Sequence, residues 1–172
     1  MLYFAYGSNL SSVRLRQRVP SAEFVATGQL RKHRLLFHKI GMDGSAKCDA
    51  FLTGRAGDIL YGALYRINPE QKEHLDLAEG LGNGYDVKQV TIVTGSAGSV
   101  AAFTYYATRT TAEIKPFHWY KEHVLFGARE HCLPGHYIEK IALIPSINDE
   151  DSHRTKQEQG IYLSASLSLI HI

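Results

Sequence analysis

The chain is poor in cysteine: Cys48 and Cys132 are the only two in 172 residues, and they form no CxxC motif. Small disulfide-stapled domains and zinc domains carry more cysteines, at recurring spacings. Neither class is therefore indicated, and this cysteine usage is typical of a reducing compartment. A single Cys48–Cys132 disulfide remains compatible with the sequence.

Long apolar runs and an excess of one charge are also missing. The apolar runs fall far short of the ~20 residues that a membrane helix needs, and residues 1–10 lack the basic leader of a signal peptide. The formal net charge of +2 is too small to indicate a nucleic-acid or anionic-membrane partner. We therefore expect a cytoplasmic protein without these partners, and the sequence leaves a homodimer open.

What is present is an ordinary globular composition, with 44% hydrophobic and 21% charged residues. Apolar runs predict strands at 2–6, 24–30, 33–38, 50–53, 59–67, 85–93 and 100–107, the last two joined by a turn at 95–98. Helical signals cover 11–18, 69–79, 116–130 and 134–141. Because strands and helices do not alternate regularly, we predict an α+β fold with a strongly curved sheet.

The last 27 residues differ from the rest. Residues 148–159 are polar and charged, and residues 161–172 form a serine–leucine tail without turn or cap signals. We interpret residues 1–145 as the domain and residues 146–172 as a C-terminal appendage of uncertain order.

The N-terminal segment is the first candidate for a functional site. It is a strand, a glycine turn and a helix start, with the sequence Tyr3-Phe4-Ala5-Tyr6-Gly7-Ser8-Asn9-Leu10. A helix start leaves backbone N–H groups without intrahelical partners and carries partial positive charge, so it suits a carboxylate or a developing oxyanion. The alternative is a plain tight turn capped by Ser8 or Asn9.

Glu79 is the second candidate. The helix that carries it should begin at Asn68-Pro69 and end at Gly80. Glu79 shares a face with Leu75, which points it toward protein, and it lies in the last turn, where the helix dipole opposes negative charge. Both effects destabilise the charged carboxylate relative to the neutral acid, which makes the carboxylate the stronger base that general-base catalysis needs. The alternative is a surface acid at the end of an amphipathic helix.

Other residue types give weaker or negative signals. Among ten tyrosines, Tyr85, Tyr105, Tyr106 and Tyr120 are candidates, although each alone is more typical of a core residue. The nine histidines form no HExxH motif, and Gly80–Gly84 is not GxGxxG. The sequence also lacks a P-loop and a nucleophile elbow. Metal, nucleotide and serine-hydrolase chemistry are therefore not indicated.

Taken in order, these segments resemble the γ-glutamylcyclotransferase family, whose wider group includes the AIG2-like proteins. The resemblance spans about residues 2–144 and is carried by Tyr3–Leu10, Gly28–Phe37, Asp43–Ser45, Gly62–Tyr65, Leu75-Asp76, Glu79-Gly80, Tyr85, Tyr120-Lys121, Gly127–Glu130, Leu133-Pro134 and Tyr137. It implies a small mixed barrel-like sheet with peripheral helices.

The resemblance also implies a reaction of glutathione metabolism without cofactor or metal. The α-amine of a γ-glutamyl amide, amino acid or peptide attacks its own γ-carbonyl, giving 5-oxoproline and a free amine. Glu79 would be the general acid/base, and the enzyme would be classed as a transferase or lyase. The substrate-binding residues would be Tyr3, Phe4, Ala5, Tyr6, Gly7, Ser8, Asn9, Tyr120 and Tyr105, with Tyr106 as the alternative to Tyr105.

Two other functions remain open on the sequence. One is a non-catalytic binding module with the same pocket, and the other is a hydrolase in which Glu79 activates water. The sequence does not identify the leaving amine.

Overall fold

The computed structural model describes residues 1–95 and 98–169, with side chains to residue 165. Five strands close into a barrel in the order β1 (Leu2–Ala5), β5 (Ile59–Arg66), β2 (Glu23–Arg31), β6 (Tyr85–Thr94) and β7 (Gly98–Ala107). The contact between β1 and β7 is parallel and the others are antiparallel, so the sheet is mixed. Strands β3 (His33–Ile40) and β4 (Ala46–Leu52) pair separately.

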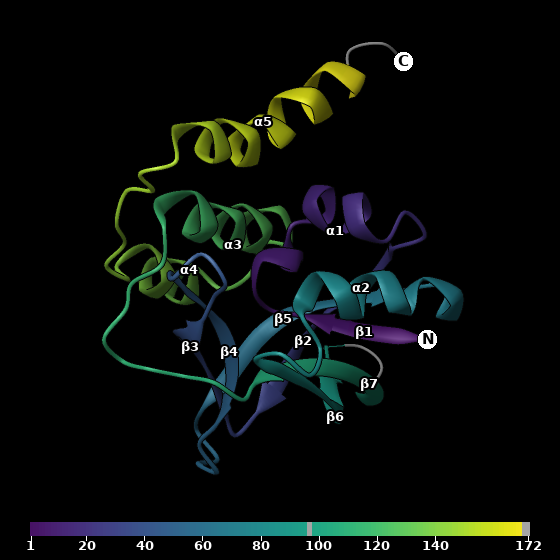
Figure 1. The fold of residues 1–172 in the computed structure, drawn as a ribbon. Helices are drawn as coiled ribbons and strands as arrows, with labels where there is room; N and C mark the ends of the chain where they lie inside the picture. The colour runs from purple at the N-terminus through teal and green to yellow at the C-terminus, as the bar shows by residue number, and fades with distance from the viewer. Residues whose placement is uncertain (96–97, 170–172) are drawn as a thin grey trace.

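The helices gather on one side of the strands (Figure 1). They are a 3₁₀ turn (Ser8–Leu10), α1 (Ser12–Arg18), a second 3₁₀ turn (Pro69–Gln71), α2 (Lys72–Glu79), α3 (His118–Glu130), α4 (Gly135–Ala142) and α5 (Ser152–Leu169). The α+β class with a small mixed barrel and peripheral helices is confirmed. The predicted turn at 95–98 falls in part, and residues 170–172 entirely, outside the described residues.

Apolar side chains fill the barrel and explain its closure. Phe4, Leu60, Leu64 and Ile92 are each at most 1% exposed. Gly62 lets β1 pass close to β5, because a Cβ there would lie 2.4 Å from the carbonyl oxygen of Ala5. Replacing this glycine would therefore push the two strands apart.

The helix that carries Glu79 ends as predicted, but the predicted helical segment is divided at its start. Asn68 caps the 3₁₀ turn Pro69–Gln71 by accepting the N–H of Glu70 at 3.1 Å, and α2 follows directly from Lys72. Gly80 ends it with φ 71°, a left-handed conformation that glycine adopts without steric cost. Leu75 is fully buried beneath the helix, which fixes the face on which Glu79 projects.

The cysteines and the described helices bear on two expectations from the sequence, one about a disulfide and one about membrane-spanning helices. Both cysteines are free, with Cys48 buried and Cys132 exposed, so the alternative of a disulfide is not realised. Among the described residues, no helix combines the length and apolar character needed to cross a membrane.

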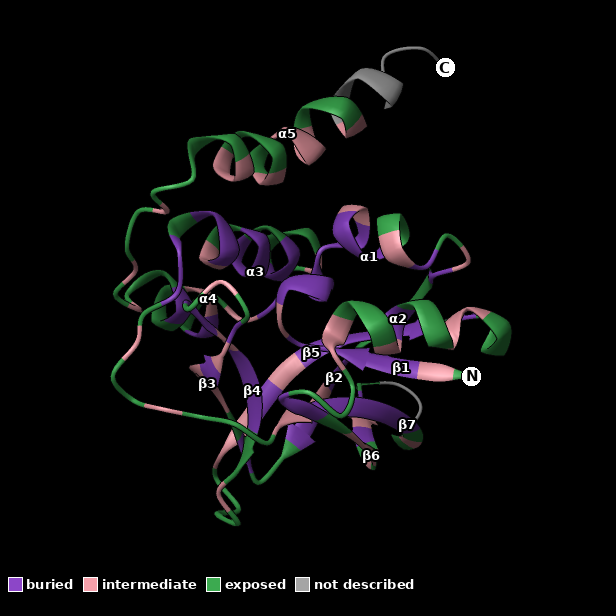
Figure 2. Cartoon of the chain, in the orientation of Figure 1, coloured by how far each residue is buried: buried purple, intermediate pink, exposed green. Residues whose placement is uncertain are grey.

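Helix α5 lies where the sequence predicted no helix. It packs on α1 and α3 through polar groups: Glu158 pairs with Arg14 at 2.5 Å and with His123 at 2.9 Å. The Tyr162 hydroxyl lies 2.6 Å from His123 Nδ1. Figure 2 shows the outer face of α5 exposed and its inner face partly buried. Since this docking uses charge and hydrogen bonds, it leaves no apolar periodicity in the sequence.

The Arg14–Glu158 pair gives a stability prediction. Desolvation raises the pKa of Glu158, but the hydrogen bond with His123 and the charge of Arg14 outweigh it and bring the pKa to about 2. The depressed pKa means that this stabilisation is present above the usual Glu pKa of about 4.5. It is lost as the pH falls toward 2. We expect Glu158→Gln to lower the free energy of unfolding by about 1–3 kcal/mol at pH 7.

Urea unfolding of wild type and Glu158→Gln measures this loss. The difference between their free energies of unfolding should shrink as the pH falls from 4.5 to 2. Glu150→Gln is the matched control, because Glu150 is exposed on the segment that leads into α5. Equal stability of the Glu158 and Glu150 variants at pH 7 would contradict a stabilising role for the pair.

A truncation within α5 should have little effect. The docking groups Glu158 and Tyr162 precede residue 164, so a chain that ends at Leu163 retains them. We expect deletion of residues 164–172 to shift the melting temperature by less than about 2 °C, as measured by circular dichroism. Loss of soluble protein would show that these residues pack on the domain or on a partner.

Candidate active site

The N-terminal segment leaves the barrel and turns into the helical layer at Gly7. Gly7 precedes the 3₁₀ turn Ser8–Leu10, so it brings no side-chain cap to the N–H groups that begin this turn. It presses against β4, because a Cβ at Gly7 would lie 3.0 Å from the Cβ of Cys48. Ser11 then caps α1, accepting the N–H of Arg14. The start of the turn is thus held at the end of the barrel.

A small cavity opens at this end, with about 260 Å³ of space including its mouth. It is lined by Tyr3, Tyr6, Gly7, Ser8, Asn9, Cys48, Glu79, Tyr85, Tyr105 and Tyr120. Six separate segments of the chain, from β1 to α3, therefore contribute to one site. Most of the residues predicted from the sequence come together here.

Two residues of the predicted substrate-binding set do not line this cavity. Phe4 and Ala5 are fully buried in the core. The Phe4 ring lies against Gly62, and its carbonyl accepts the Thr104 hydroxyl at 2.8 Å. Their side chains therefore support the strand that carries Tyr3 and Tyr6.

Glu79 has one anchored and one open oxygen. Its Oε1 accepts Asn9 Nδ2 at 2.6 Å and Arg18 Nη1 at 2.9 Å. No hydrogen bond reaches Oε2 from the described part of the chain, and the side chain is 15% exposed. A carboxyl held in this way keeps its lone pairs available on Oε2 for a proton from a ligand.

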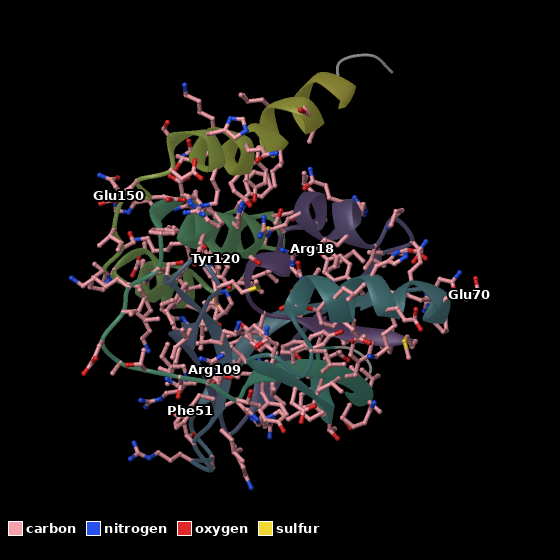
Figure 3. The ribbon with its side chains drawn as sticks, viewed as in Figure 1. Arg18, Phe51, Glu70, Arg109, Tyr120 and Glu150 are labelled. Atoms are coloured by element: carbon pink, nitrogen blue, oxygen red, sulfur yellow. The ribbon has the colours of Figure 1, made fainter. Side chains whose placement is uncertain are left out.

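Arg18 is the site residue that the sequence analysis missed. It lies between α1 and α2 (Figure 3) and also donates to Asn9 Oδ1 at 2.9 Å. Its guanidinium donates to the Glu79 carboxylate, and such charge-assisted hydrogen bonds are stabilising. The position of Glu79 at the end of its helix does not predict this contact. Asn9 completes the network by donating to the Tyr3 hydroxyl at 3.2 Å.

The tyrosines form hydrogen-bonded walls. Tyr120 accepts the backbone N–H of Cys48 at 3.0 Å, and Tyr85 donates to the Cys48 carbonyl. Tyr6 donates to the Tyr105 carbonyl at 2.7 Å. Burial raises the pKa of each of these phenols above its ordinary value. At neutral pH they are therefore hydrogen-bonding groups and not bases.

The structure separates the two alternatives on β7. Tyr105 faces the cavity, and its hydroxyl donates to Asp76, which Lys72 holds at 2.7 Å. Tyr106 faces outward, where its hydroxyl lies 3.4 Å from Asp86. Successive residues of a strand point to opposite sides, so only Tyr105 of this pair can contact a ligand in this cavity.

Cys48 lines the cavity as a neutral thiol. Burial raises the pKa of this thiol above its usual range. Because the thiolate is the nucleophilic form, Cys48 is unsuited to attack a substrate. The described residues also contain no group of three His, Cys, Asp or Glu side chains placed to hold a metal ion.

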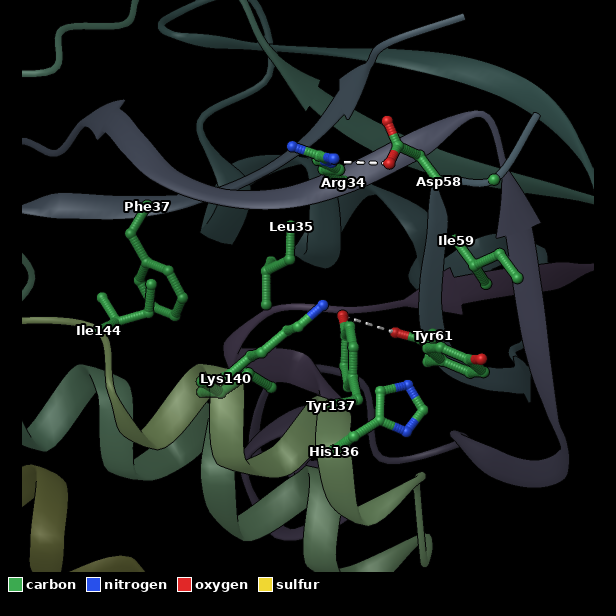
Figure 4. Close-up of a pocket in the computed structure, with 12 residues that line it drawn as sticks. Arg34, Leu35, Phe37, Asp58, Ile59, Tyr61, His136, Tyr137, Lys140 and Ile144 are labelled. Carbon is green, nitrogen blue, oxygen red and sulfur yellow. Dashed lines mark hydrogen bonds and ion pairs between the residues drawn. The ribbon is translucent and has the colours of Figure 1, made fainter. Parts of the chain in front are cut away.

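A second cavity lies between β3, β5 and α4 (Figure 4). Its one acidic lining residue, Asp58, is paired with Arg34 at 2.8 Å. The Tyr137 hydroxyl contacts the Tyr61 carbonyl at 3.4 Å. This cavity holds none of the predicted site residues. The Asp58 oxygen that Arg34 does not contact is buried without a hydrogen-bond partner.

The class defined by this fold and cavity is that of a small barrel protein with a single anchored carboxyl among buried tyrosines. Residues 59–141 match the AIG2-like family. Mouse γ-glutamylcyclotransferase is 32% identical over 147 residues, covering 83% of this chain and 78% of that protein. Human γ-glutamylcyclotransferase is 32% identical over 150 residues with the same coverage.

Solved structures agree with these relatives. A γ-glutamyl cyclotransferase structure superposes with a TM-score of 0.82 at 28% identity, covering 91% of this chain and 96% of that one. The chain therefore belongs to the γ-glutamylcyclotransferase family.

The Arg18–Glu79 ion pair gives a prediction that is independent of activity. Both side chains are less than a quarter exposed, at 23% and 15%. In a double-mutant cycle of Arg18→Met and Glu79→Met, we expect a coupling free energy of about 1–2 kcal/mol from urea unfolding. The exposed pair Arg66–Glu23, at 3.8 Å, is the control and should couple by less than about 0.5 kcal/mol. Additive effects of the two site mutations would contradict the pairing.

Proposed function

We propose that this protein is a γ-glutamylcyclotransferase that converts a γ-glutamyl amide, amino acid or peptide to 5-oxoproline and the free amine. The observation that carries the proposal is the Glu79 carboxyl, anchored through Oε1 by Asn9 and Arg18 and open at Oε2. Membership of the γ-glutamylcyclotransferase family supports the same reaction.

The proposed reaction begins with proton removal. The α-amine of the substrate is largely protonated at neutral pH, and Glu79 Oε2 takes a proton from it. The freed nitrogen lone pair attacks the γ-carbonyl carbon, and a five-membered ring closes. When the tetrahedral intermediate collapses, the bond to the leaving nitrogen breaks. Glu79 returns its proton to that nitrogen. The regenerated carboxylate then takes the second proton of the ring nitrogen and passes it to the departing amine, which leaves as an ammonium, so the lactam nitrogen keeps one hydrogen and the carboxylate is free again.

Groups around Glu79 would hold the substrate in the folded rotamer that cyclisation requires. The N–H groups at Gly7 and Ser8 would bind the α-carboxylate or the oxyanion. Tyr105 and Tyr120 would orient the glutamyl chain through their hydroxyl oxygens. Well-oriented intramolecular attack lowers barriers by roughly 7–11 kcal/mol in model systems, so positioning would be the main contribution of this cavity.

We also propose that residues 1–145 form the catalytic domain and residues 146–172 an appendage to it. All lining residues of the site lie between Tyr3 and Tyr120, which supports this division. The free thiols of Cys48 and Cys132 support a cytoplasmic location.

A capped substrate tests the reaction type. In cyclisation the nucleophile belongs to the substrate, so an N-acetyl-γ-glutamyl amide should give no product. A hydrolase that uses water would release N-acetylglutamate, and a binding module would turn over neither the free nor the capped compound. Mass spectrometry should show 5-oxoproline from the free amine alone. Glutamate as the first product, or cleavage of the capped compound, would contradict the proposal.

Glu79→Gln tests the acid–base assignment in the same assay. The amide oxygen can still accept from Asn9 and Arg18, so the fold should persist, but the basic oxygen is lost. We expect turnover to fall by about a hundredfold or more. Near-normal turnover in a folded variant would remove Glu79 from this role.

A further inference from the structure

Lys39 is a buried lysine at the edge of the active-site cavity. It lies on β3 and is 5% exposed. Its ammonium lies 4.6 Å from the centroid of the Tyr85 ring, and Tyr85 lines the cavity. Gly84 makes room for it, because a Cβ there would lie 2.8 Å from Lys39 Cε and 3.1 Å from Nζ. The glycine at position 84 therefore leaves space for the end of the Lys39 side chain.

The Lys39 ammonium contacts no acceptor in the described part of the chain: it makes no hydrogen bond and no ion pair there. Lys47 and Lys72 each contact a carboxylate instead, Asp43 at 2.8 Å and Asp76 at 2.7 Å. The Lys39 side chain is buried, but its Nζ is not sealed from solvent. The cation–π contact with Tyr85 stabilises the ammonium, but it leaves the N–H donors of Lys39 unused.

Lys39 packs on the loop that follows the helix of Glu79. It packs on Gly84, in the short loop that leads from Glu79 at the end of α2 to Tyr85 at the start of β6. Burial lowers the pKa of Lys39, and the negative charge of Glu79 opposes that shift. The two charges therefore act on each other across the site.

The charges around the cavity indicate the net charge of the ligand. Arg18 offsets Glu79 by direct contact, so Lys39 adds a positive charge that no contacting carboxylate of the described chain neutralises. A γ-glutamyl amino acid carries one ammonium and two carboxylates at neutral pH, and its net charge is negative. A γ-glutamyl amide of a simple amine lacks the second carboxylate and is neutral overall.

We propose that the Lys39 ammonium binds a carboxylate of the substrate, and that this carboxylate belongs to the departing amino acid. The assignment rests on the proposed cyclotransferase function and narrows it, because it favours leaving groups that carry a carboxylate. The glutamyl α-carboxylate is the other source of the same chemistry, and the substrates below distinguish the two.

The test compares Lys39→Met with the matched control Lys88→Met. Lys88 also lies over a tyrosine, Tyr106 at 5.2 Å, but on the outer side of β7. With γ-glutamyl-alanine we expect Lys39→Met to lower kcat/KM by about tenfold to a hundredfold, mainly through KM. Lys39→Arg should recover part of this loss, and Lys88→Met should behave as wild type.

A second substrate identifies the carboxylate. With γ-glutamyl-ethylamide, which has no carboxylate on the leaving group, Lys39→Met should have little effect on kcat/KM. An equal loss on both substrates would assign Lys39 to the α-carboxylate and would still support carboxylate binding. Unchanged kinetics on both would overturn the proposal. So would a shifted pH profile of kcat with KM unchanged, because Lys39 would then act on Glu79 and not on the substrate.

Calorimetric binding separates this proposal from the proposed function. In the Glu79→Gln background, which should not turn over, Lys39→Met should weaken binding of γ-glutamyl-alanine by a similar factor. Lys39-dependent binding without 5-oxoproline release by wild type would support the Lys39 site and contradict the cyclotransferase. If wild type releases 5-oxoproline but its binding and kinetics do not depend on Lys39, the cyclotransferase function is supported and the Lys39 site is contradicted. Circular dichroism of each variant verifies that it is folded.

Discussion

The carboxyl of Glu79 is held by two side chains from the first eighteen residues, and this junction fixes the active site. Asn9 comes from the turn after β1, Arg18 from the end of α1, and Glu79 from the end of α2. Each of these groups contacts the other two, so the three segments cannot shift independently. Because the same turn presents the N–H groups at Gly7, one network positions both these groups and the Glu79 carboxyl.

This junction also divides the chemical roles among the lining residues. The buried phenols and the Cys48 thiol stay neutral, since burial raises their pKa values. Arg18 contacts one oxygen of the Glu79 carboxyl and leaves the other open. In the proposed reaction, proton transfer would be confined to this carboxyl, while its neighbours would supply hydrogen bonds and shape. Such a site suits a reaction in which the substrate brings its own nucleophile.

Much of this arrangement could be predicted from the sequence, because its signals are local. Asn68 and Gly80 mark the ends of the helix that carries Glu79, and the glycine turn after Tyr6 marks the N-terminal segment. These signals depend on capping and turn chemistry, which act over a few residues. The order of strands and helices predicted an α+β fold with a strongly curved sheet, and the mixed barrel followed from the family resemblance.

Long-range polar contacts could not be predicted in the same way. Arg14, Arg16 and Arg18 have the same local character in α1, and only the tertiary fold selects Arg18 for Glu79. No apolar periodicity in the sequence indicated α5, because it docks through hydrogen bonds of Glu158 and Tyr162 and through the stacking of Tyr162 on Phe126. A helix with an apolar stripe would have been visible as a periodicity.

Phe4 and Ala5 show the converse limit, since a sequence motif does not separate residues that touch a ligand from those that support them. Both belong to the segment that resembles the family's binding loop, yet they are fully buried in the core. Tyr3 and Tyr6 of the same segment line the cavity.

The short loop from Gly80 to Gly84 connects the helix that ends at Glu79 to the strand that begins at Tyr85. It begins at the residue that ends the Glu79 helix, and it finishes against Lys39 just before Tyr85 enters the cavity wall. Asn83 and Gly82 hydrogen-bond within it, to Gly80 and Tyr85, so it is a fixed turn. Backbone geometry therefore fixes the end of the Glu79 helix relative to Gly84, on which the end of the Lys39 side chain packs. If Lys39 binds a substrate carboxylate as proposed, a base and a cation held at the two ends of this turn would select substrates by the distance between their own amine and carboxylate.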